Sequence, residues 1–318
     1  MSLKREVLKL GKKAGLFEAA RRATSGHLRI LGYHGLWVTP GAEFGDCTFI
    51  SPEQFAGRME RLKRSGHAVL GLDAAVSLLA EDRLPPCSVV ITIDDGWVST
   101  YTHMLPVLEA LELPATLYAT SWYAGRALPV VNVAVHYLCA AAGRPEEDAA
   151  LAAAEIDSLP VEQRLDALVA LGARLGVDDA WLANRQFNIM SADELADARV
   201  RGLDIQLHTH RHIDVGEQVD ALTQEIEQNR AFLAAATGTE PTHFCYPSGT
   251  FHPDAPALLA ACGVRSATLV TEGLNAPGSD PFRLRRLLDG RRITDLEFDA
   301  YLAGALHVGE PLRRLLAA

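Results

Sequence analysis

The chain has 318 residues, of which 48% are apolar and 22% charged, and its formal net charge at pH 7 is −10. This composition excludes a disordered chain and permits either one barrel or two medium-sized domains. The negative charge argues against a nucleic-acid partner, because phosphate binding needs clustered Lys and Arg, whereas a neutral glycan sets no such requirement.

The first 22 residues are basic, unlike the rest of the chain. They carry seven basic and two acidic residues, so this segment has a charge of +5 and the remainder about −15. Apolar residues recur there at roughly helical spacing, at Leu3, Val7, Leu10 and Leu16. The pattern predicts a basic amphipathic helix within residues 1–27. Such a helix either contacts an anionic membrane surface through residues 1–22 or caps the protein as a solvated helix.

No apolar stretch of signal-peptide or transmembrane length occurs near the start of the sequence. We therefore expect a cytoplasmic protein, either free or peripheral at the inner face of the membrane. The number of cysteines is odd and no two have the short spacing of a metal site, so they are expected to be reduced and mostly structural. They are Cys47, Cys87, Cys139, Cys245 and Cys262.

Short apolar runs alternate with helical or turn-rich stretches along the rest of the chain. These runs are continuously apolar, as is typical of parallel strands that are buried on both faces, and they predict an α/β fold. The predicted strands are 28–33, 88–93, 115–119, 203–207, 243–246, 264–270 and 284–287. This alternation by itself fits a barrel and an open doubly wound sheet equally well.

Polar residues at the carboxyl ends of several predicted strands favour a barrel. They are His34, Asp94, Asp95, His208 and Tyr246. Barrel enzymes gather their active sites at this end, whereas an open sheet usually has a glycine-rich phosphate loop after its first strand, and this sequence has none. We therefore expect a distorted (β/α) barrel of seven or eight strands over residues 28–318.

A segment without strand-like runs interrupts this pattern between residues 130 and 188. It is rich in Ala and Leu, with Glu, Asp and Arg interspersed, which predicts a helical insertion of several short helices. Ser191 and Glu194 then have the spacing of a capping box, which predicts the start of the next helix.

Asp94 and Asp95 follow the apolar run 88–93 and precede Gly96. Two adjacent carboxylates at the end of a buried strand are costly, because their like charges repel and burial disfavours both ionised forms. A bound cation would stabilise them, with one carboxylate as a ligand and the other as a proton acceptor. The alternative is an Asp-Asp-Gly turn that caps the following helix.

Three histidines occur within five residues at His208, His210 and His212, directly after the run 203–207. Neutral imidazole is a preferred ligand of zinc and related divalent metals. His208 and His212 could reach one ion, and a carboxylate from elsewhere would complete three protein ligands and leave positions open for water and substrate. The alternative is a solvated histidine cluster.

These segments resemble the polysaccharide deacetylase family, also called carbohydrate esterase family 4 or the chitooligosaccharide deacetylase homology domain. The family motif Thr-Phe-Asp-Asp-Gly stands here as Thr92-Ile93-Asp94-Asp95-Gly96, and His-Ser/Thr-x-x-His stands as His208-Thr209-His210-Arg211-His212. The resemblance implies that Asp94 is the general base and that Asp95, His208 and His212 hold the metal.

The later motifs of the family are less complete here. In the third, Arg-x-x-Phe-Arg-x-Pro-Tyr-Gly, only Phe244, Pro247 and Gly249 match, and Cys245 stands where the Arg that orients the base would be. The resemblance implies that the backbone N–H of Tyr246 stabilises the oxyanion. The fourth motif is echoed only by Asp280 and the run Arg283-Leu284-Arg285-Arg286.

The fifth motif, Leu-x-His, supplies the general acid of the family. Its nearest counterpart is Leu306-His307, with the spacing off by one residue. His307 is therefore either the acid or a surface histidine near the end of a helix. His34 either lines the cavity or packs within the fold.

The resemblance implies metal-dependent removal of an N-acetyl group from a sugar, oligosaccharide or glycolipid, with a role in cell-surface glycan biosynthesis. Zinc is the expected metal, with nickel, cobalt and manganese as alternatives. Two other functions stay open at this point. One is a catalytically silent glycan-binding barrel without the base-orienting Arg and the acid, and the other is a different barrel metal hydrolase that uses His208 and His210 as a pair.

Overall fold

The computed structural model describes residues 3–39 and 48–307. Its centre is a parallel sheet in the order β1-β8-β7-β6-β5-β4-β3-β2. An additional parallel pairing of β1 with β3 closes seven of the strands into a barrel, and β2 pairs only with β3 outside it. The strands are β1 (Arg29–Tyr33), β2 (Ala68–Val69), β3 (Ser88–Asp95), β4 (Thr116–Ala119), β5 (Asp204–Leu207), β6 (His243–Cys245), β7 (Ser266–Glu272) and β8 (Leu284–Leu288).

The barrel prediction is confirmed, and each of the seven predicted strands is present with ends that differ by a residue or two. The two-residue strand β2 was not predicted, because two half-buried residues make no recognisable pattern. The strands are apolar because both faces are covered: β3, for example, is buried at every position from Ser88 to Asp94.

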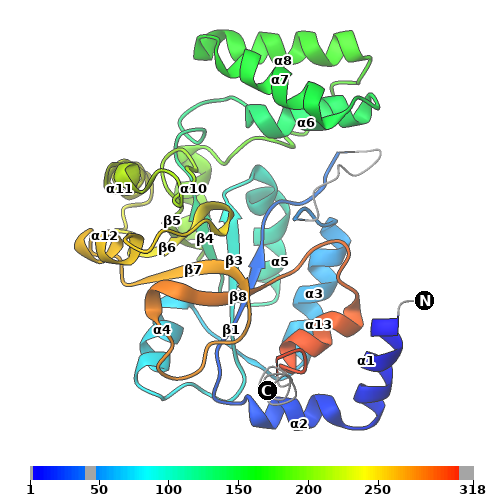
Figure 1. The fold of residues 1–318 in the computed structure, drawn as a ribbon, viewed down its shortest axis with the longest axis vertical. Helices are drawn as coiled ribbons and strands as arrows, with labels where there is room; N and C mark the ends of the chain where they lie inside the picture. The colour runs from blue at the N-terminus through cyan, green and yellow to red at the C-terminus, as the bar shows by residue number, and fades with distance from the viewer. Residues whose placement is uncertain (1–2, 40–47, 308–318) are drawn as a thin grey trace.

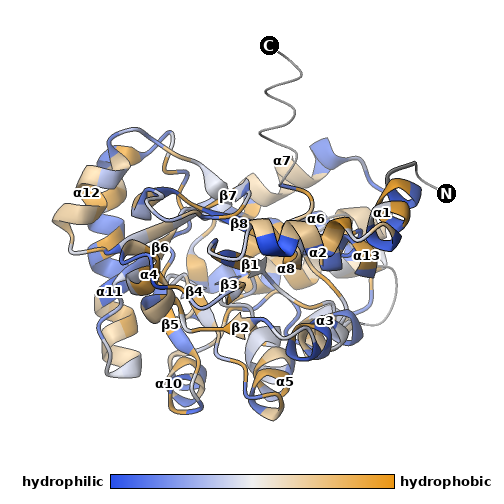
Figure 2. Ribbon diagram, turned by 90° about the horizontal axis from the view of Figure 1, so that it is seen from below, coloured by the Kyte–Doolittle hydropathy of each residue, from blue (hydrophilic) through white to orange (hydrophobic). Residues whose placement is uncertain are grey.

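Helices surround the barrel and carry apolar residues on one side and polar residues on the other (Figures 1 and 2). They are α3 (Pro52–Arg64), α4 (Leu72–Ala80), α5 (Leu105–Ala110), α10 (Ala192–Val200), α11 (Leu222–Thr237), α12 (Ala255–Ala261) and α13 (Asp295–Leu302). Helix α10 begins with the predicted capping box of Ser191 and Glu194. Four single turns complete these connections: a π-helical turn at Thr100–Met104 and 3-10 turns at Val219–Ala221, Pro247–Gly249 and Pro281–Arg283.

Two apolar cores stabilise the barrel. The larger lies between the sheet and the surrounding helices. The smaller fills the barrel interior, where Ile30, Val90 and Tyr118 meet residues of α4 such as Leu72 and Leu79. Helix α4 therefore closes the amino-terminal end of the barrel, and the carboxyl-terminal end is left for polar side chains.

The predicted helical insertion is present between β4 and β5, as α6 (Val131–Ala141), α7 (Glu146–Asp157), α8 (Val161–Leu175) and the short α9 (Ala180–Ala183). Helices α6 to α8 form a lobe beyond the barrel (Figure 1). Gln186 fixes the base of this lobe: its Oε1 accepts hydrogen bonds from the N–H groups of Val38 and Thr39, and its Nε2 donates to the carbonyl of Leu36. The loop after β1 and the insertion are thus joined on one side of the barrel end.

The prediction of a single helix near the amino terminus was wrong. There are two, α1 (Leu3–Lys13) and α2 (Leu16–Ala23), because Gly15 has a φ of 77° and turns the chain between them. Cys47 lies outside the described residues, and the other four cysteines are free thiols. Within residues 3–39 and 48–307, every helix is too short or too polar to cross a bilayer.

Candidate active site

Asp95, His208 and His212 meet at the carboxyl end of the barrel. Asp95 is the last residue of β3, and His208 directly follows β5. The Nε2 atoms of His208 and His212 lie 3.2 and 3.4 Å from Oδ1 of Asp95, and the three ligand atoms all lie within 4.8 Å of one another. Ligands held about 2.1 Å from a tetrahedral zinc ion stand about 3.4 Å apart, so this spacing fits such an ion.

Hydrogen bonds orient two of these three side chains. Nδ1 of His208 lies 2.8 Å from the carbonyl oxygen of Cys245, so this nitrogen carries the proton and Nε2 presents its lone pair to the site. Nε1 of Trp97 donates to Oδ2 of Asp95 at 2.7 Å, which leaves Oδ1 for an ion. The group thus has the outer contacts that metal ligands usually have.

The backbone around this group is strained. Asp95, Thr209, His212 and Ser248 all have φ between 53° and 71°, in the left-handed region that residues other than glycine rarely adopt. Strain of this kind persists only where the surrounding structure enforces it, and it is typical of functional sites.

The charges of these residues are coupled. Burial acts to raise the pKa of Asp95, but its close contacts with His208 and His212 outweigh burial and hold this pKa well below its usual value. Burial acts to lower the pKa of His212, and Asp95 outweighs it and raises this pKa. Asp95 is therefore ionised at neutral pH, as a ligand must be.

A second set of atoms, from Asp94, His208 and Cys245, is also close enough to hold an ion, but its chemistry is less suitable. Both carboxylate oxygens of Asp94 already accept hydrogen bonds from Arg286, each at 2.7 Å. Burial raises the pKa of the Cys245 thiol well above its usual value, so it is protonated and a poor ligand. The set of Asp95, His208 and His212 is the better metal site.

Arg286 supplies the guanidinium that the third motif lacks. It comes from β8, is completely buried, and pairs with both oxygens of Asp94 across the barrel interior. Burial acts to raise the pKa of Asp94, and the charge and hydrogen bonds of Arg286 outweigh it and lower this pKa. The predicted base is therefore oriented and ionised, although Cys245 stands where the family has its Arg.

Gly32 on β1 makes room for this arrangement. A Cβ atom at this position would lie 2.5 Å from Cδ2 of Leu288 and 3.5 Å from Nη1 of Arg286. The guanidinium is also fixed by hydrogen bonds from its Nε to the carbonyl of Leu269 and from its Nη1 to Oγ1 of Thr92. Arg286 is thus held by several groups as well as by Asp94.

His34, which follows the last residue of β1, lines the site. Its Nε2 lies 3.6 Å from Oδ2 of Asp94, and 16% of its side chain is exposed. Its Nδ1 is buried and has no hydrogen-bond partner among the described residues. Of the two roles considered from the sequence, lining the cavity is the one that this position supports.

The expectation for the Tyr246 N–H is contradicted. This group donates a hydrogen bond to the carbonyl of Thr268 at 3.1 Å, so it is not available to an oxyanion. The motif in fact places its Tyr after the Pro, and the residue after Pro247 here is Ser248. The exposed Ser248 has a φ of 53°, and within the described part of the chain its N–H has no acceptor.

The two remaining candidate histidines, His307 and His210, do not lie where the sequence analysis needed them. His307 lies 3.7 Å from Glu272 in the segment after α13, and the carbonyl of Leu302 at the end of that helix accepts a hydrogen bond from Arg29 at the start of β1. Arg29 begins β1, whereas His34 follows its last residue, so this segment lies at the opposite end of the strand from the candidate site. Nδ1 of His210 bonds to Ser121, and His210 belongs to neither set of ligand atoms found among the described residues, so the structure gives no support to a metal-binding pair of His208 and His210.

Several solved structures have a similar fold, at sequence identities too low to indicate more than the fold. The Streptococcus pyogenes deacetylase PplD in complex with acetate has a TM-score of 0.62 and 16% identity, over 88% of this chain and 99% of that one. IcaB from Ammonifex degensii has a TM-score of 0.59 and 20% identity, over 87% and 97% of the chains. A de-N-acetylase from Aggregatibacter actinomycetemcomitans has a TM-score of 0.58 and 16% identity, over 86% and 99%.

No curated protein matches the chain significantly. The sequence profile of the polysaccharide deacetylase family matches residues 81–267, which is more than half of the chain and includes Asp94, Asp95, His208 and His212. His34 and Arg286 lie outside the matched segment. The chain belongs to the polysaccharide deacetylase family.

Proposed function

We propose that this protein is a metal-dependent N-deacetylase that acts on a sugar or glycan with N-acetyl groups. The observation that carries the proposal is the arrangement of two adjacent carboxylates with different partners. Asp95 faces His208 and His212 at the spacing of metal ligands, and Asp94 is held by Arg286. Family membership supports sugar deacetylation as the reaction class.

Each residue of the candidate site has a separate role in the proposed reaction. A divalent ion held by Asp95, His208 and His212 would polarise the acetamide carbonyl and lower the pKa of a bound water to about 7. Asp94 accepts the proton of the attacking water, since Arg286 keeps its carboxylate ionised. The N–H of Ser248 donates to the oxyanion that forms on the carbonyl.

His34 donates the proton that the departing amine needs. It is the titratable side chain next to Asp94 on the side of β1, and its partly exposed ring can exchange protons with water. The carbon–nitrogen bond then breaks, and the products are acetate and a free amino sugar.

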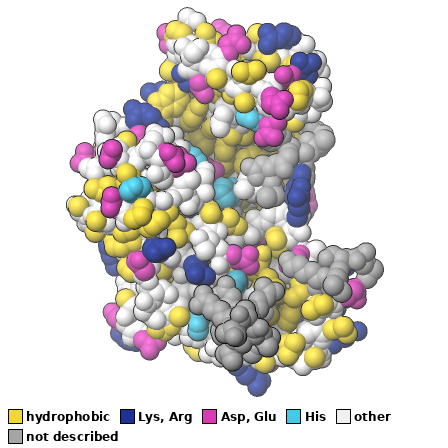
Figure 3. Space-filling view, in the orientation of Figure 1, with side chains coloured by type: hydrophobic (Ala, Val, Ile, Leu, Met, Phe, Trp, Pro, Cys, Tyr) yellow, Lys and Arg dark blue, Asp and Glu magenta, His cyan; other side chains and the backbone are white. Residues whose placement is uncertain are grey.

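We propose zinc as the metal, with nickel, cobalt and manganese as alternatives, because one carboxylate and two imidazoles suit all four. The proposed substrate is an N-acetylated sugar, oligosaccharide or glycolipid used in cell-surface glycan biosynthesis. A hollow between the insertion and the barrel, in which a histidine side chain is visible, offers space for such a substrate (Figure 3). We further propose that the protein works in the cytoplasm, and the four free thiols among the described residues are consistent with a reducing compartment.

The experiment that tests this function combines metal analysis with acetate release over a panel of N-acetylated sugars and oligosaccharides. Stoichiometric metal and acetate release that a chelator stops are expected. Asp94→Asn should keep the metal and lose turnover, whereas Asp95→Asn should lose both. Turnover that survives in Asp94→Asn would overturn the assignment of the base.

The catalytically silent glycan-binding barrel remains the second candidate. It was suggested by the sequence, in which the motifs lack the Arg that orients the base and the His that serves as the acid. Arg286 can orient the base and His34 can serve as the acid, so the case for this alternative is weaker. Sugar binding without acetate release at any metal loading would restore this alternative.

A further inference from the structure

Large apolar side chains are exposed at the corner between α1 and α2. Val7 is 58% exposed, Leu10 66% and Leu16 59%. They account for half of the large apolar side chains that are exposed in the described residues, although they lie within ten positions of one another. Figure 3 shows apolar side chains at this corner, at the lower right of the molecule.

These three side chains form one patch. Val7 and Leu10 are three residues apart on one face of α1, and the exposed Ala14 directly follows the helix. The side chain of Leu16 lies beside that face, since its Cδ1 would be 3.4 Å from a Cβ atom at Gly11. The turn at Gly15 therefore joins the apolar residues of two helices into a single surface.

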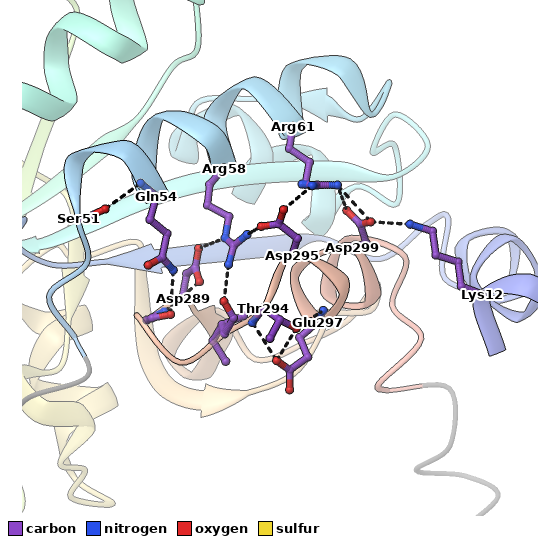
Figure 4. Close-up of polar contacts among 12 residues, drawn as sticks. Lys12, Ser51, Gln54, Arg58, Arg61, Asp289, Thr294, Asp295, Glu297 and Asp299 are labelled. Atoms are coloured by element: carbon purple, nitrogen blue, oxygen red, sulfur yellow. Dashed lines mark hydrogen bonds and ion pairs between the residues drawn. The ribbon is translucent and has the colours of Figure 1, made fainter. Parts of the chain in front are cut away.

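The patch faces solvent because a charged side chain on another side of α1 holds the helix against α13. Lys12 pairs with Asp299 of α13 at 2.7 Å, and Asp299 also pairs with Arg61 of α3 at 3.2 Å (Figure 4). The same network continues through Asp295 to the buried Arg58. An amphipathic helix normally packs with its apolar face inward, and here that face is left exposed.

Basic side chains cover the rest of α1, with Lys13 beside Leu10 and with Arg5 and Lys9 on the other side of the helix. Arg5 and Lys13 are exposed and have no carboxylate partner among the described residues, and Lys9 is 38% exposed beside Glu6. The segment 1–22 carries +5 while the rest of the chain carries about −15. An anionic surface would attract this corner and repel the rest of the protein. The charge distribution therefore favours binding with this corner toward the surface.

We propose that the corner formed by α1 and α2 docks on the surface of a lipid bilayer that contains anionic lipids. Val7, Leu10 and Leu16 enter the interface between headgroups and acyl chains, and Lys13 contacts lipid phosphates beside them. Arg5 and Lys9, on the other side of α1, add to the attraction between the helix and the anionic surface. The proposal is independent of the reaction that the barrel carries out, because no residue of the corner belongs to the candidate active site.

The test is co-sedimentation of the metal-loaded full chain with vesicles of phosphatidylcholine, with and without phosphatidylglycerol. We expect binding to the vesicles with phosphatidylglycerol that weakens as salt is raised. A variant with Val7→Ser, Leu10→Ser and Leu16→Ser should bind at least about tenfold more weakly. Arg5→Gln with Lys13→Gln should weaken binding about 25-fold, at roughly fivefold for each charge.

Matched controls come from the helical insertion. Leu151→Ser removes a side chain that is 73% exposed on α7, and Arg144→Gln with Arg174→Gln removes two exposed charges. Both controls should bind vesicles as the unaltered chain does, and all variants should keep the same thermal unfolding and acetate release from a soluble substrate.

Two results would overturn the proposal. One is binding that is equal for both kinds of vesicle or equal in the triple serine variant. The other is a dimer, detected by light scattering without lipid, that the triple serine variant abolishes, since the patch would then be an interface between two copies of this chain.

Discussion

Replacing Arg286 with Met should separate the stability of the barrel from the chemistry of its base. The guanidinium makes two hydrogen bonds of 2.7 Å to Asp94 and is completely buried. Removal of one partner from a buried ion pair typically costs about 3–5 kcal/mol, because the other charge is left unpaired. That is a large part of the roughly 5–15 kcal/mol that stabilises a typical domain.

The same substitution should weaken the base. Without Arg286 the burial of Asp94 is opposed only by the smaller effects of His34 and His208, so the pKa of Asp94 rises and the carboxylate is protonated over more of the pH range. We expect turnover at pH 7 to fall by roughly 10²-fold or more, and the acidic limb of the pH profile to move to higher pH. The assay is acetate release by the metal-loaded enzyme from pH 5 to 9, together with urea unfolding.

A double-mutant cycle identifies the cause of the effect. Arg286→Met with Asp94→Asn removes both charges, so it should be more stable than Arg286→Met alone by about 2 kcal/mol or more. Arg285→Met is the matched control, since its side chain is only half-buried and does not contact Asp94. An unchanged pH profile and a loss of stability below about 1 kcal/mol in Arg286→Met would refute the reasoning.

Three further predictions concern single side chains. His34→Gln should lose roughly 10²-fold or more of amide turnover but little activity on 4-nitrophenyl acetate, whose leaving group needs no proton. Tyr246→Phe should leave turnover unchanged and stability equal or slightly higher, because the hydroxyl is buried without a partner among the described residues. The half-buried His67 should make stability depend on pH: burial lowers its pKa from 6.5 to about 4, although its bond to the carbonyl of Leu302 opposes this shift. The unfolded chain binds the proton more readily, so stability should be full above pH 6.5 and should fall by about 1–2 kcal/mol as the pH drops to 4, after allowance for partial exposure.

Each of these predictions has a result that would contradict it. Equal losses on the amide and on the ester would remove His34 from the role of acid. A tenfold loss of acetate release in Tyr246→Phe would show that its hydroxyl takes part in the reaction. Urea unfolding between pH 4 and 7 tests the third, and a His67→Gln variant with the same pH dependence as the unaltered chain would assign that dependence to other groups.

The barrel and its insertion were predictable because both leave periodic patterns in the sequence. Strands buried on both faces read as continuous apolar runs, and the insertion reads as helix-forming sequence without them. The two-residue strand β2 depends on a single pairing with β3, and the division into α1 and α2 depends on the φ angle of one glycine. Neither feature leaves a periodic pattern in the sequence. Gly15 between two apolar residues was the only local sign of that turn.

The candidate metal site was predictable because its residues stand at the carboxyl ends of two predicted strands. Asp95 ends β3, and His208 and His212 share the loop after β5, so two parallel strands bring them to the same end of the barrel. Arg286 and His34 were not assigned, because their roles depend on pairings between strands that are distant in the sequence. A buried Arg in an apolar strand needs a carboxylate partner, and this need was the signal that could have found Arg286.

The position of Arg286 also bears on how the protein is made. Asp94 lies on β3, whereas its partner lies on β8, the last strand of the barrel, which pairs with both β1 and β7. During synthesis the carboxylate therefore emerges long before the cation that balances it. A nascent chain without β8 can contain Asp95, His208 and His212 but not a correctly ionised base. The ion pair that holds the proposed base therefore depends on the strand that closes the barrel.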